Sequence, residues 1–416
     1  MQRQVKLYHY QLPLDCAMIL RGQSVSVREG WIIELQERVE LQESVELQES
    51  AELQESAELH VQCKRTQVNK VGRGEIAPLP GFSDETSAQA KQQLESMIHI
   101  WLEQGIVELS VCCPSVAFGF SMALLELDDE LPQMIYCDDI HNGKLHNGNS
   151  HHHINSALLL AADLRVINRK HAQLAASSLC KLKIATQPTA EGACHDGEIA
   201  RQLLQRYPQL RLRLDANRRW NLVNALAFAK QIPVALRPRI DFIEEPCHNS
   251  SDSYLFTRKT GIAIAWDESL RDACKNQRGR GYIEFLMSTI AECHASETAS
   301  IAAIVIKPML VGTITHCRHL IEQAYQLGLT VVISSSLESS FGLLQLARLS
   351  QWLTPDTTPG LDTLHVFKQQ VAMPYPGCNL PLIALTALSC RTYLQNIDNQ
   401  LQNMNTKQQN IVEAHR

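Results

Sequence analysis

No apolar run in this sequence approaches the length needed to cross a bilayer, so a membrane-spanning helix is not expected. The first residues, Met-Gln-Arg-Gln-Val-Lys-Leu, also lack the apolar core of a secretory signal peptide. The basic residues are scattered, and the formal net charge of −6 argues against a nucleic-acid binder. We therefore expect a cytoplasmic protein, a monomer or weak oligomer, whose partner is a small molecule and neither a membrane nor a nucleic acid.

Regular cysteine spacing is absent as well. The 13 cysteines are an odd number without a Cys-x-x-Cys pair, which is typical of reduced, mostly buried thiols in a cytoplasmic chain. The hydrophobic content of 45% and the charged content of 20% are ordinary for a globular protein. A length of 416 residues allows two or three domains, or one barrel with a smaller partner domain.

What the sequence does contain is a series of short apolar runs, each closed by an ionisable residue. The runs end at Lys183, Asp215, Glu244, Asp267 and Lys307. Runs of this kind are typical of buried parallel strands, and the intervals of about 20 to 40 residues leave room for a crossover helix. The pattern predicts an α/β fold with a modified (β/α)8-type barrel over residues 135–391. Its site would lie at the C-terminal ends of the strands.

The residue types at these strand ends indicate the chemistry. Three carboxylates brought together repel one another, so protons or a cation must lie among them. Oxygen ligands suit Mg²⁺, which prefers octahedral coordination and retains several waters. Lys183 and Lys307 would flank that ion, and a lysine near a dication can act as a base at neutral pH. The set suits removal of a proton α to a carboxylate, with the metal holding the enediolate.

The pattern of expected strands and helices in the N-terminal third predicts a separate α+β capping domain over residues 1–134. Strands are expected over Val5–Leu14 and Gly30–Leu35. Helices are expected over Ser83–Gly105, which opens with a Ser-Asp-Glu-Thr cap, and over Pro114–Leu127. These helices would pack on the early sheet.

Two segments of this domain leave alternatives open. The polar segment Cys16–Glu29, which contains Arg21, is either a mobile lid over the substrate or an ordinary hairpin connection. Residues 34–60 repeat the unit Val/Ala-Glu-Leu-Gln-Glu-Ser, which as a helix would set like charges three apart. The near-alternation of apolar and polar residues favours a long acidic hairpin arm, and solvated disorder is the competing interpretation. We assign the repeat no chemistry.

Three further segments are expected to lie outside the barrel framework. His151-His152-His153, in a stretch rich in Asn and Gly, could hold a metal but is more typical of an exposed loop. Residues 274–299 form an insertion after the strand of Asp267, where they could reshape the mouth of the barrel. The Gln/Asn-rich residues 392–416 indicate a frayed polar tail.

An ordered set of motifs resembles the o-succinylbenzoate synthase family of the enolase superfamily, over nearly the whole chain. The motifs are Gly74-Glu-Ile-Ala-Pro-Leu-Pro-Gly-Phe, Pro114-Ser-Val-Ala-Phe-Gly, Leu212-Arg-Leu-Asp-Ala-Asn-Arg, Phe242-Ile-Glu-Glu-Pro-Cys, Gly261-Ile-Ala-Ile-Ala-Trp-Asp-Glu-Ser-Leu, Val305-Ile-Lys-Pro and Ile333-Ser-Ser-Ser-Leu-Glu-Ser-Ser. Enzymes of this superfamily are known to use a lysine base together with Mg²⁺. The resemblance implies an enolase-like fold and loss of water from 2-succinyl-6-hydroxy-2,4-cyclohexadiene-1-carboxylate, giving 2-succinylbenzoate for menaquinone.

The resemblance also implies a role for each matching residue. The Mg²⁺ ligands would be Asp215, Glu244 and Asp267. Lys183 would take the α-proton and return it to the departing hydroxide on the same face, with Lys181 beside it tuning its pKa. Lys307 would stabilise the intermediate from the opposite face.

Other residues would support the chemistry or bind the substrate. Ser334 and Gly360 match positions where the family contacts the succinyl carboxylate region, and Arg21 would join them if its segment reaches the site. Glu245 and Glu268 each follow a proposed ligand and could orient it or pair with a lysine.

Other functions remain open from the same residues. A racemase of N-acylamino acids or an epimerase of dipeptides, within the same superfamily, would use the same two lysines, one on each face. A barrel lysine could instead form a Schiff base, as in aldolases. A non-catalytic metal-binding barrel is the last alternative.

Overall fold

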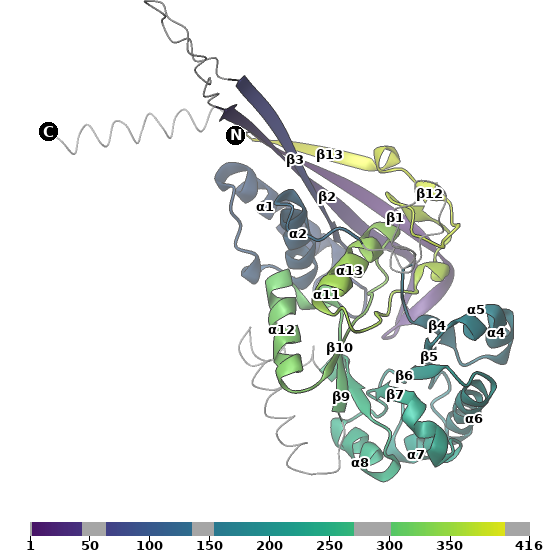
Figure 1. Cartoon of the computed structure of the whole chain (residues 1–416). Coiled ribbons are helices and arrows are strands. Elements are labelled where there is room, and N and C mark those ends of the chain that lie inside the picture. Colours follow the sequence, from purple (N-terminus) through teal and green to yellow (C-terminus); the bar gives the residue numbers. More distant parts are fainter. Residues whose placement is uncertain (1, 44–63, 135–153, 270–300, 396–416) are drawn as a thin grey trace, which may run out of the picture.

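The structure is a computed structural model that describes residues 2–43, 64–134, 154–269 and 301–395. Two parts are visible in Figure 1: an antiparallel sheet with two helices, and a curled parallel sheet surrounded by helices. Four predicted features fall wholly or partly outside the described residues: most of the acidic repeat, the His151–His153 stretch, the 274–299 insertion and, from residue 396 onward, the polar tail. No helix among the described residues is long and apolar enough to cross a membrane.

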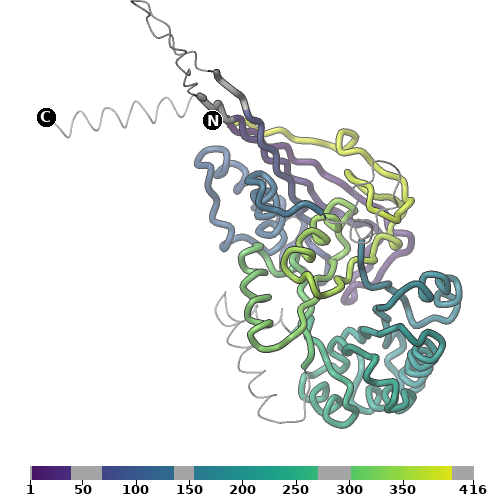
Figure 2. The backbone as a smooth tube through the Cα atoms, in the orientation of Figure 1, coloured from purple at the N-terminus to yellow at the C-terminus, as the bar shows by residue number. Residues whose placement is uncertain are grey.

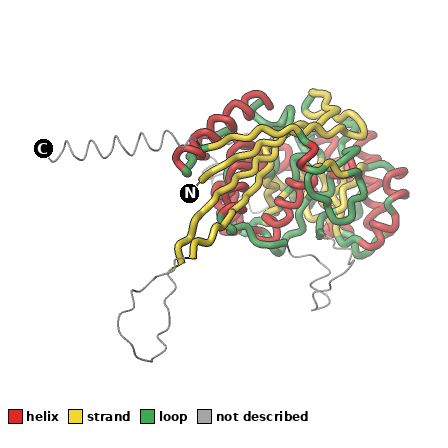
Figure 3. The backbone as a smooth tube through the Cα atoms, turned by 90° about the horizontal axis from the view of Figure 1, so that it is seen from above, coloured by secondary structure: helices red, strands yellow, loops and turns green. Residues whose placement is uncertain are grey.

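The antiparallel sheet has the order β13-β1-β2-β3. Its strands are β1 (Gln2–Leu20), β2 (Gln23–Glu43), β3 (Lys64–Ile76) and β13 (Ser389–Leu394). β2 and β3 pair in register out to Glu43 opposite Lys64, so the hairpin interpretation is confirmed for the part of the repeat that is described. Figure 3 shows the paired ends of β2 and β3 extending beyond the body of the protein.

The expectation of a mobile loop over Cys16–Glu29 is wrong. β1 and β2 continue through most of this segment, and Leu20 pairs with Gln23 across a two-residue turn. Arg21 has φ 47° and Gly22 has φ 85°. Positive φ at both central residues is the requirement of a type I′ turn, whose twist matches that of the flanking strands. The competing interpretation, a hairpin connection, is the correct one.

Two helices cover the antiparallel sheet. α1 (Ser87–Gln104) begins four residues later than expected, at a capping box formed by Thr86 and Gln89. α2 (Pro114–Leu127) has the predicted bounds, and a short 3-10 turn, η1 (Leu109–Val111), precedes it. α2 packs closely on β3, because a Cβ atom at Gly74 would lie 1.8 Å from the carbonyl oxygen of Gly119.

The second part is a seven-stranded parallel sheet with the order β10-β9-β8-β7-β6-β5-β4. Its strands are β4 (Leu158–Ala161), β5 (Leu179–Lys183), β6 (Arg211–Asp215), β7 (Ile240–Glu244), β8 (Ile264–Trp266), β9 (Ile301–Ile306) and β10 (Thr330–Ile333). The eighth position is taken by an extended segment, in which Gly360 bridges Ser334 and the Pro359 carbonyl accepts from Ala157 N at 2.9 Å. The predicted modified barrel is thus confirmed.

Helices follow the strands of this sheet, as the βαβ pattern requires, except between β8 and β9, where the connection lies outside the described residues. They are α4 (Leu164–Arg169), α5 (His171–Ala176), α6 (Ala190–Arg206), α7 (Leu222–Lys230), η2 (Val234–Arg239), α8 (Ser250–Thr260), α11 (Pro308–Val311), α12 (Ile314–Gln326) and α13 (Ser340–Leu353). After α13 come η3 (Leu364–Val366), the parallel pair β11 (Gln370–Val371) and β12 (Leu382–Ile383), and η4 (Leu385–Ala387).

The chain then returns to its beginning. β13 pairs with β1, with Tyr8 opposite Cys390, and Figure 2 shows this yellow segment beside the purple N-terminal strands. Thr392 to Leu394 therefore belong to the capping sheet, whereas the sequence led us to expect the polar tail to begin at residue 392. The two parts also share one apolar core, which includes Tyr10 and Phe118 from the first part and Ile306 and Phe341 from the second.

Candidate active site

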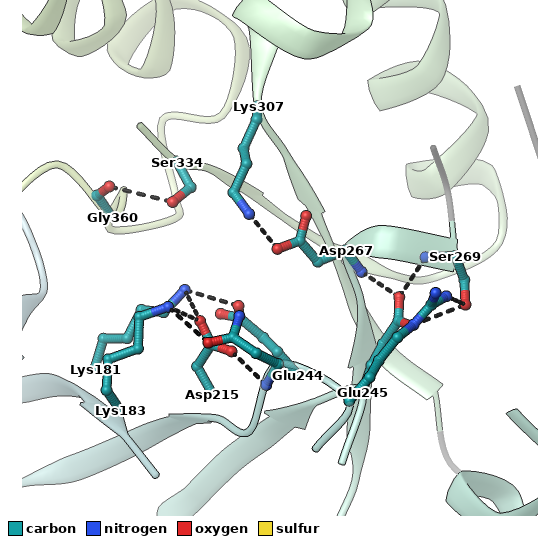
Figure 4. A network of polar contacts seen from close by, with 12 residues as sticks. Lys181, Lys183, Asp215, Glu244, Glu245, Asp267, Ser269, Lys307, Ser334 and Gly360 are labelled. Carbon is teal, nitrogen blue, oxygen red and sulfur yellow. Dashed lines mark hydrogen bonds and ion pairs between the residues drawn. The ribbon is translucent and has the colours of Figure 1, made fainter. Parts of the chain in front are cut away.

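Five ionisable residues gather at the C-terminal edge of the parallel sheet (Figure 4). Lys183, Asp215 and Glu244 are the last residues of β5, β6 and β7, and they stand directly opposite one another in the strand register. Asp267 and Lys307 follow β8 and β9 immediately. Because parallel strands end at one edge of the sheet, the predicted site residues face a common space.

The lysines lie on two sides of the carboxylates. Lys181 Nζ is 2.7 Å from Glu244 Oε2 and 3.1 Å from Asp215 Oδ2. Lys183 Nζ is 2.5 Å from the same Asp215 oxygen. Lys307 forms an ion pair with Asp267 on the opposite side (Figure 4). The structure therefore brings both predicted catalytic lysines to the site from different strands.

Burial and charge shift the pKa values of the carboxyl groups in opposite directions. Burial favours the neutral form of Asp215, but Lys181 and Lys183 outweigh it and hold the pKa of Asp215 well below its usual range. Burial also opposes ionisation of Asp267, whose pKa Lys307 nevertheless lowers. Burial raises the pKa of Glu244 to about 8, with Lys181 opposing and the charges of Asp215 and Asp267 adding to the rise. The negative charge of Glu244 is thus the least compensated of the three.

The donor set fits a hard cation, although the side chains are not arranged around one. Within the described residues no three acidic, histidine or cysteine side chains converge closely enough to form a metal site as they stand. The ammonium group of Lys181 instead bridges Asp215 and Glu244. All three carboxylates are buried, at 1%, 2% and 7% exposure, and they offer only oxygen donors, the type that Mg²⁺ prefers.

Glu245 supports the strand end that carries Asp267. Its Oε1 accepts hydrogen bonds from Asp267 N at 2.8 Å and Ser269 N at 2.7 Å. Its Oε2 accepts from Ser269 Oγ at 2.9 Å and pairs with Arg218. By accepting from the amides of both Asp267 and Ser269, the Glu245 carboxylate fixes the backbone beside Asp267, a residue of the next strand end, whereas the sequence led us to expect contact with Glu244 or a lysine.

Glu268 is buried beside the site. It is 3% exposed, and burial together with the charge of Asp267 raises the pKa of Glu268 to about 7. Arg218 and Asn217 were not singled out from the sequence, although both lie in the Leu-Asp-Ala-Asn-Arg motif. Asn217 Oδ1 lies 3.4 Å from Lys183 Nζ, so it helps to orient that lysine.

Ser334 and Gly360 lie together across the site from Asp215 (Figure 4). Ser334 Oγ donates to the Gly360 carbonyl at 3.3 Å, and Ser334 N donates to Ile306 O at 2.9 Å. The second bond ties Ser334 to the residue that precedes Lys307. Both predicted substrate contacts therefore border the space between the lysines.

Arg21 is connected to this space through the aromatic ring of Phe82, which both Arg21 and Lys307 approach. Its guanidinium lies 4.8 Å from the ring centroid of Phe82, and Lys307 Nζ lies 5.9 Å from the same ring. The hairpin turn packs tightly here, since a Cβ atom at Gly81 would lie 2.5 Å from Leu20 O. Phe82 was not predicted as a site residue, and only its place in the Gly74–Phe82 motif could have indicated it.

Both parts of the chain match known protein families. Residues 2–68 and 38–127 match the MenC N-terminal domain family, and residues 169–278 match the enolase C-terminal domain-like family. The curated o-succinylbenzoate synthase of Aliivibrio salmonicida (strain LFI1238) is 40% identical over 92% of this chain and 97% of its own length. That of Pectobacterium atrosepticum is 38% identical over 93% of this chain and 98% of its own length.

Solved structures agree in fold. The o-succinylbenzoate synthase of Thermosynechococcus elongatus BP-1, complexed with Mg in its active site, has a TM-score of 0.58 at 18% identity and covers 92% of this chain and 97% of its own. An N-succinyl Arg/Lys racemase from Bacillus cereus has a TM-score of 0.60 at 16% identity, with 94% and 100% covered. At these identities the likeness concerns the fold alone.

Proposed function

The chain belongs to the o-succinylbenzoate synthase family of the enolase superfamily, and from that premise we propose how its own residues carry out the reaction. The protein is a hydro-lyase of menaquinone biosynthesis. Its substrate would be 2-succinyl-6-hydroxy-2,4-cyclohexadiene-1-carboxylate and its product 2-succinylbenzoate. The observation that carries the assignment of roles is the pair of lysines on opposite sides of three buried carboxylates.

Lys183 is the proposed base. Its side chain is 39% exposed, against 10% for Lys181, so it is the lysine of the pair that a substrate can reach. Lys183 would take the proton from C1, leaving the electron pair on the substrate carboxylate as an enediolate. When that pair forms the ring double bond, the C6–O bond breaks, and Lys183 returns its proton to the departing hydroxide on the same face. The product ring is then aromatic.

The other lysines would act through charge. Burial opposes the protonated form of Lys181, but Asp215 and Glu244 raise its pKa, so it remains an ammonium group beside the base. Lys307, whose pKa rises because Asp267 and Glu268 outweigh its burial, would stabilise the negative charge of the enediolate from the other side.

The family works with a divalent metal ion, and we propose Mg²⁺ for this chain. Asp215, Glu244 and Asp267 would hold it. When bound it supplies positive charge opposite the substrate carboxylate, where the negative charge of the enediolate develops. The burial of three carboxylates at one strand edge supports a cation among them.

The test is turnover of the cyclohexadiene substrate, followed by ultraviolet absorbance, for the wild type and Lys183→Ala, with Mg²⁺ and with EDTA. Loss of a general base lowers the rate by about 10²- to 10⁴-fold, and we expect Lys183→Ala and EDTA treatment each to reduce kcat at least that far. Lys91→Ala is the control, since Lys91 is an exposed lysine of α1 that pairs only with Glu95 among the described residues. Lys183→Ala with kcat within tenfold of the wild type would refute the assignment.

A second activity is favoured by one feature of the same site. Lys183 and Lys307 lie on opposite sides of the carboxylates, so each could exchange a proton with one face of an α-carbon. A racemase of N-acylamino acids or an epimerase of dipeptides needs this arrangement. Racemisation of an N-succinylamino acid, with exchange of its α-proton in deuterated water, would reveal it. We expect Lys183→Ala and Lys307→Ala each to abolish racemisation, because each variant keeps only the lysine of one face.

Two further assignments rest on the composition alone. We propose that the enzyme is cytoplasmic and that it is a monomer or weak oligomer. Cell fractionation tests the first, and light scattering over a range of protein concentrations tests the second.

A further inference from the structure

The turn between β10 and α13 lies where the capping domain meets the barrel. It begins at Ser334, beside Gly360, and ends at Ser339, which is the N-cap of α13. Within it Leu337 has φ 60°, a left-handed conformation that is costly for a branched side chain. Such a conformation persists only where surrounding groups hold it, and the capping domain provides two of them.

Arg28 of β2 is the first of these groups. The side chain is 1% exposed, and its guanidinium donates five hydrogen bonds, as many as it has N–H groups. Nε donates to Leu337 O at 3.1 Å and Nη2 to Ser336 O at 3.3 Å. The remaining acceptors are carbonyl oxygens of the capping domain, those of Glu29, Ala77 and Pro78. Arg28 thus links the backbone of both domains through one planar group.

Glu75 of β3 is the second group, and it holds the other end of the turn. Its Oε1 accepts from Ser339 N at 3.0 Å and its Oε2 accepts from Ser339 Oγ at 2.5 Å. Tyr10 Oη donates to Oε1 at 2.5 Å from β1. The carboxylate lies at the N-terminus of α13, where a negative charge is favoured. A Cβ atom at Gly342 would lie 2.3 Å from Oε2, so this helix has the close approach that only glycine allows.

Hydrogen bonds also connect the turn to the substrate side of the site. Ser335 N donates to Gly360 O at 3.1 Å, and Ser335 Oγ lies 3.0 Å from Thr363 Oγ1. Ser334 Oγ donates to the same Gly360 carbonyl. A single residue separates Ser334 from Ser336, whose carbonyl Arg28 binds. A shift of the turn is therefore transmitted directly to Ser334 and Gly360.

We propose that Arg28 and Glu75 are positioning residues of the reaction. Together these capping-domain side chains clamp the Ser336–Ser339 turn of the barrel, and they thereby set Ser334 and Gly360 against the succinyl end of the substrate. This inference rests on the proposed function, because it takes Ser334 and Gly360 as the succinyl contacts. According to this proposal, the domain interface controls the binding of the succinyl end of the substrate, and it does not control the proton transfer at Lys183.

The test compares Arg28→Lys with wild type in the ultraviolet assay. Lysine has three donors in place of five and no planar fork, so Ser336 and Leu337 lose a partner. We expect KM to rise by about fivefold or more while kcat stays within about twofold, the pattern of lost binding without lost transition-state stabilisation. The second variant, Glu75→Gln, keeps the size of the side chain but weakens its bonds to Ser339, and the same split is expected.

A ligand pair separates positioning from general damage to the fold. Binding of 2-succinylbenzoate should weaken in both variants, whereas binding of benzoate, which lacks the succinyl chain, should stay the same. Arg237→Lys is the matched control, since Arg237 also donates to backbone carbonyls, those of Ala229, Ile232 and Thr260, but far from the turn. It should leave KM and both affinities unchanged.

The outcomes distinguish the two proposals. Unchanged KM and unchanged 2-succinylbenzoate affinity in both Arg28→Lys and Glu75→Gln, with Lys183→Ala inactive, would overturn the positioning role and leave the proposed function intact. Equal weakening of benzoate and 2-succinylbenzoate would also overturn it, because the loss would then not concern the succinyl end. An active Lys183→Ala would refute the proposed chemistry, whatever the other variants do.

Discussion

Glu338 tests how the burial of a carboxyl group affects the stability of this protein, because its side chain is enclosed at the domain interface. The side chain is fully buried, and Oε2 accepts from Ser336 N at 2.6 Å, while Oε1 has no hydrogen-bond partner among the described residues. Burial, with the negative charge of Glu75 adding to it, raises the pKa of Glu338 from 4.5 to about 7, against the opposing effects of nearby amides and Arg28. The perturbation we choose is Glu338→Gln, which imitates the protonated acid.

The magnitude follows from linkage. The rise from 4.5 to about 7 corresponds, at 1.36 kcal/mol per unit, to about 3 kcal/mol. The folded state binds more protons than the unfolded state within this window. The free energy of unfolding therefore falls as the pH rises from 4.5 to 7, and the penalty is complete above pH 7. Glutamine carries no charge and escapes the penalty.

We expect Glu338→Gln to be more stable than wild type by about 3 kcal/mol at pH 8 and by less than about 1 kcal/mol at pH 5. Urea unfolding followed by tryptophan fluorescence at pH 5, 6, 7 and 8 measures the difference. The control is Glu103→Gln, at an exposed position of α1, which should change stability little at either pH. A difference between Glu338→Gln and wild type that is the same at pH 5 and pH 8 would refute the reasoning.

Two further predictions concern packing and the hairpin turn. Gly74→Ala should destabilise the protein by about 2 kcal/mol or more, because the new Cβ would lie 1.8 Å from the backbone oxygen of Gly119; an unchanged melting temperature would contradict the close packing of α2 on β3. Arg21→Ala should raise KM about two- to fivefold, the equivalent of one cation–π contact, because it removes the stack on Phe82 beside Lys307. An unchanged KM would show that the turn does not contribute to the substrate side of the site.

The positions of the proposed catalytic and metal-binding residues could be predicted because they depend on local pattern. A short apolar run closed by a charged residue indicates both a buried strand and its C-terminal end, and Lys183, Asp215 and Glu244 are the final residues of their strands. Parallel strands share one edge, so the gathering of these side chains follows from the fold class. The bounds of α2 were equally predictable, since proline starts it and an apolar run continues it.

The segment around Arg21 shows where local pattern misleads. The polar composition of Cys16–Glu29 is typical of a loop, yet the backbone there pairs as a hairpin whose strands are long enough to reach Phe82. A polar strand and a polar loop have the same composition, and pairing with the neighbouring strand distinguishes them. Composition is also misleading at Thr392 to Leu394. These residues precede a Gln/Asn-rich segment, yet they pair with β1 as an edge strand.

The contacts between the domains depend on residues that the chain order keeps far apart. Arg28 bonds to Leu337, more than 300 positions away, and Glu75 bonds to Ser339 across a similar interval. Nothing near Arg28 in the sequence distinguishes it from a surface arginine of a polar strand. Two of its five bonds, those to Ser336 and Leu337, exist because the capping sheet packs against the β10–α13 turn. The strand ends and their ionisable residues therefore follow from local sequence pattern, whereas the contacts of Arg28 and Glu75 with the turn arise from packing between the domains, which local pattern does not reveal.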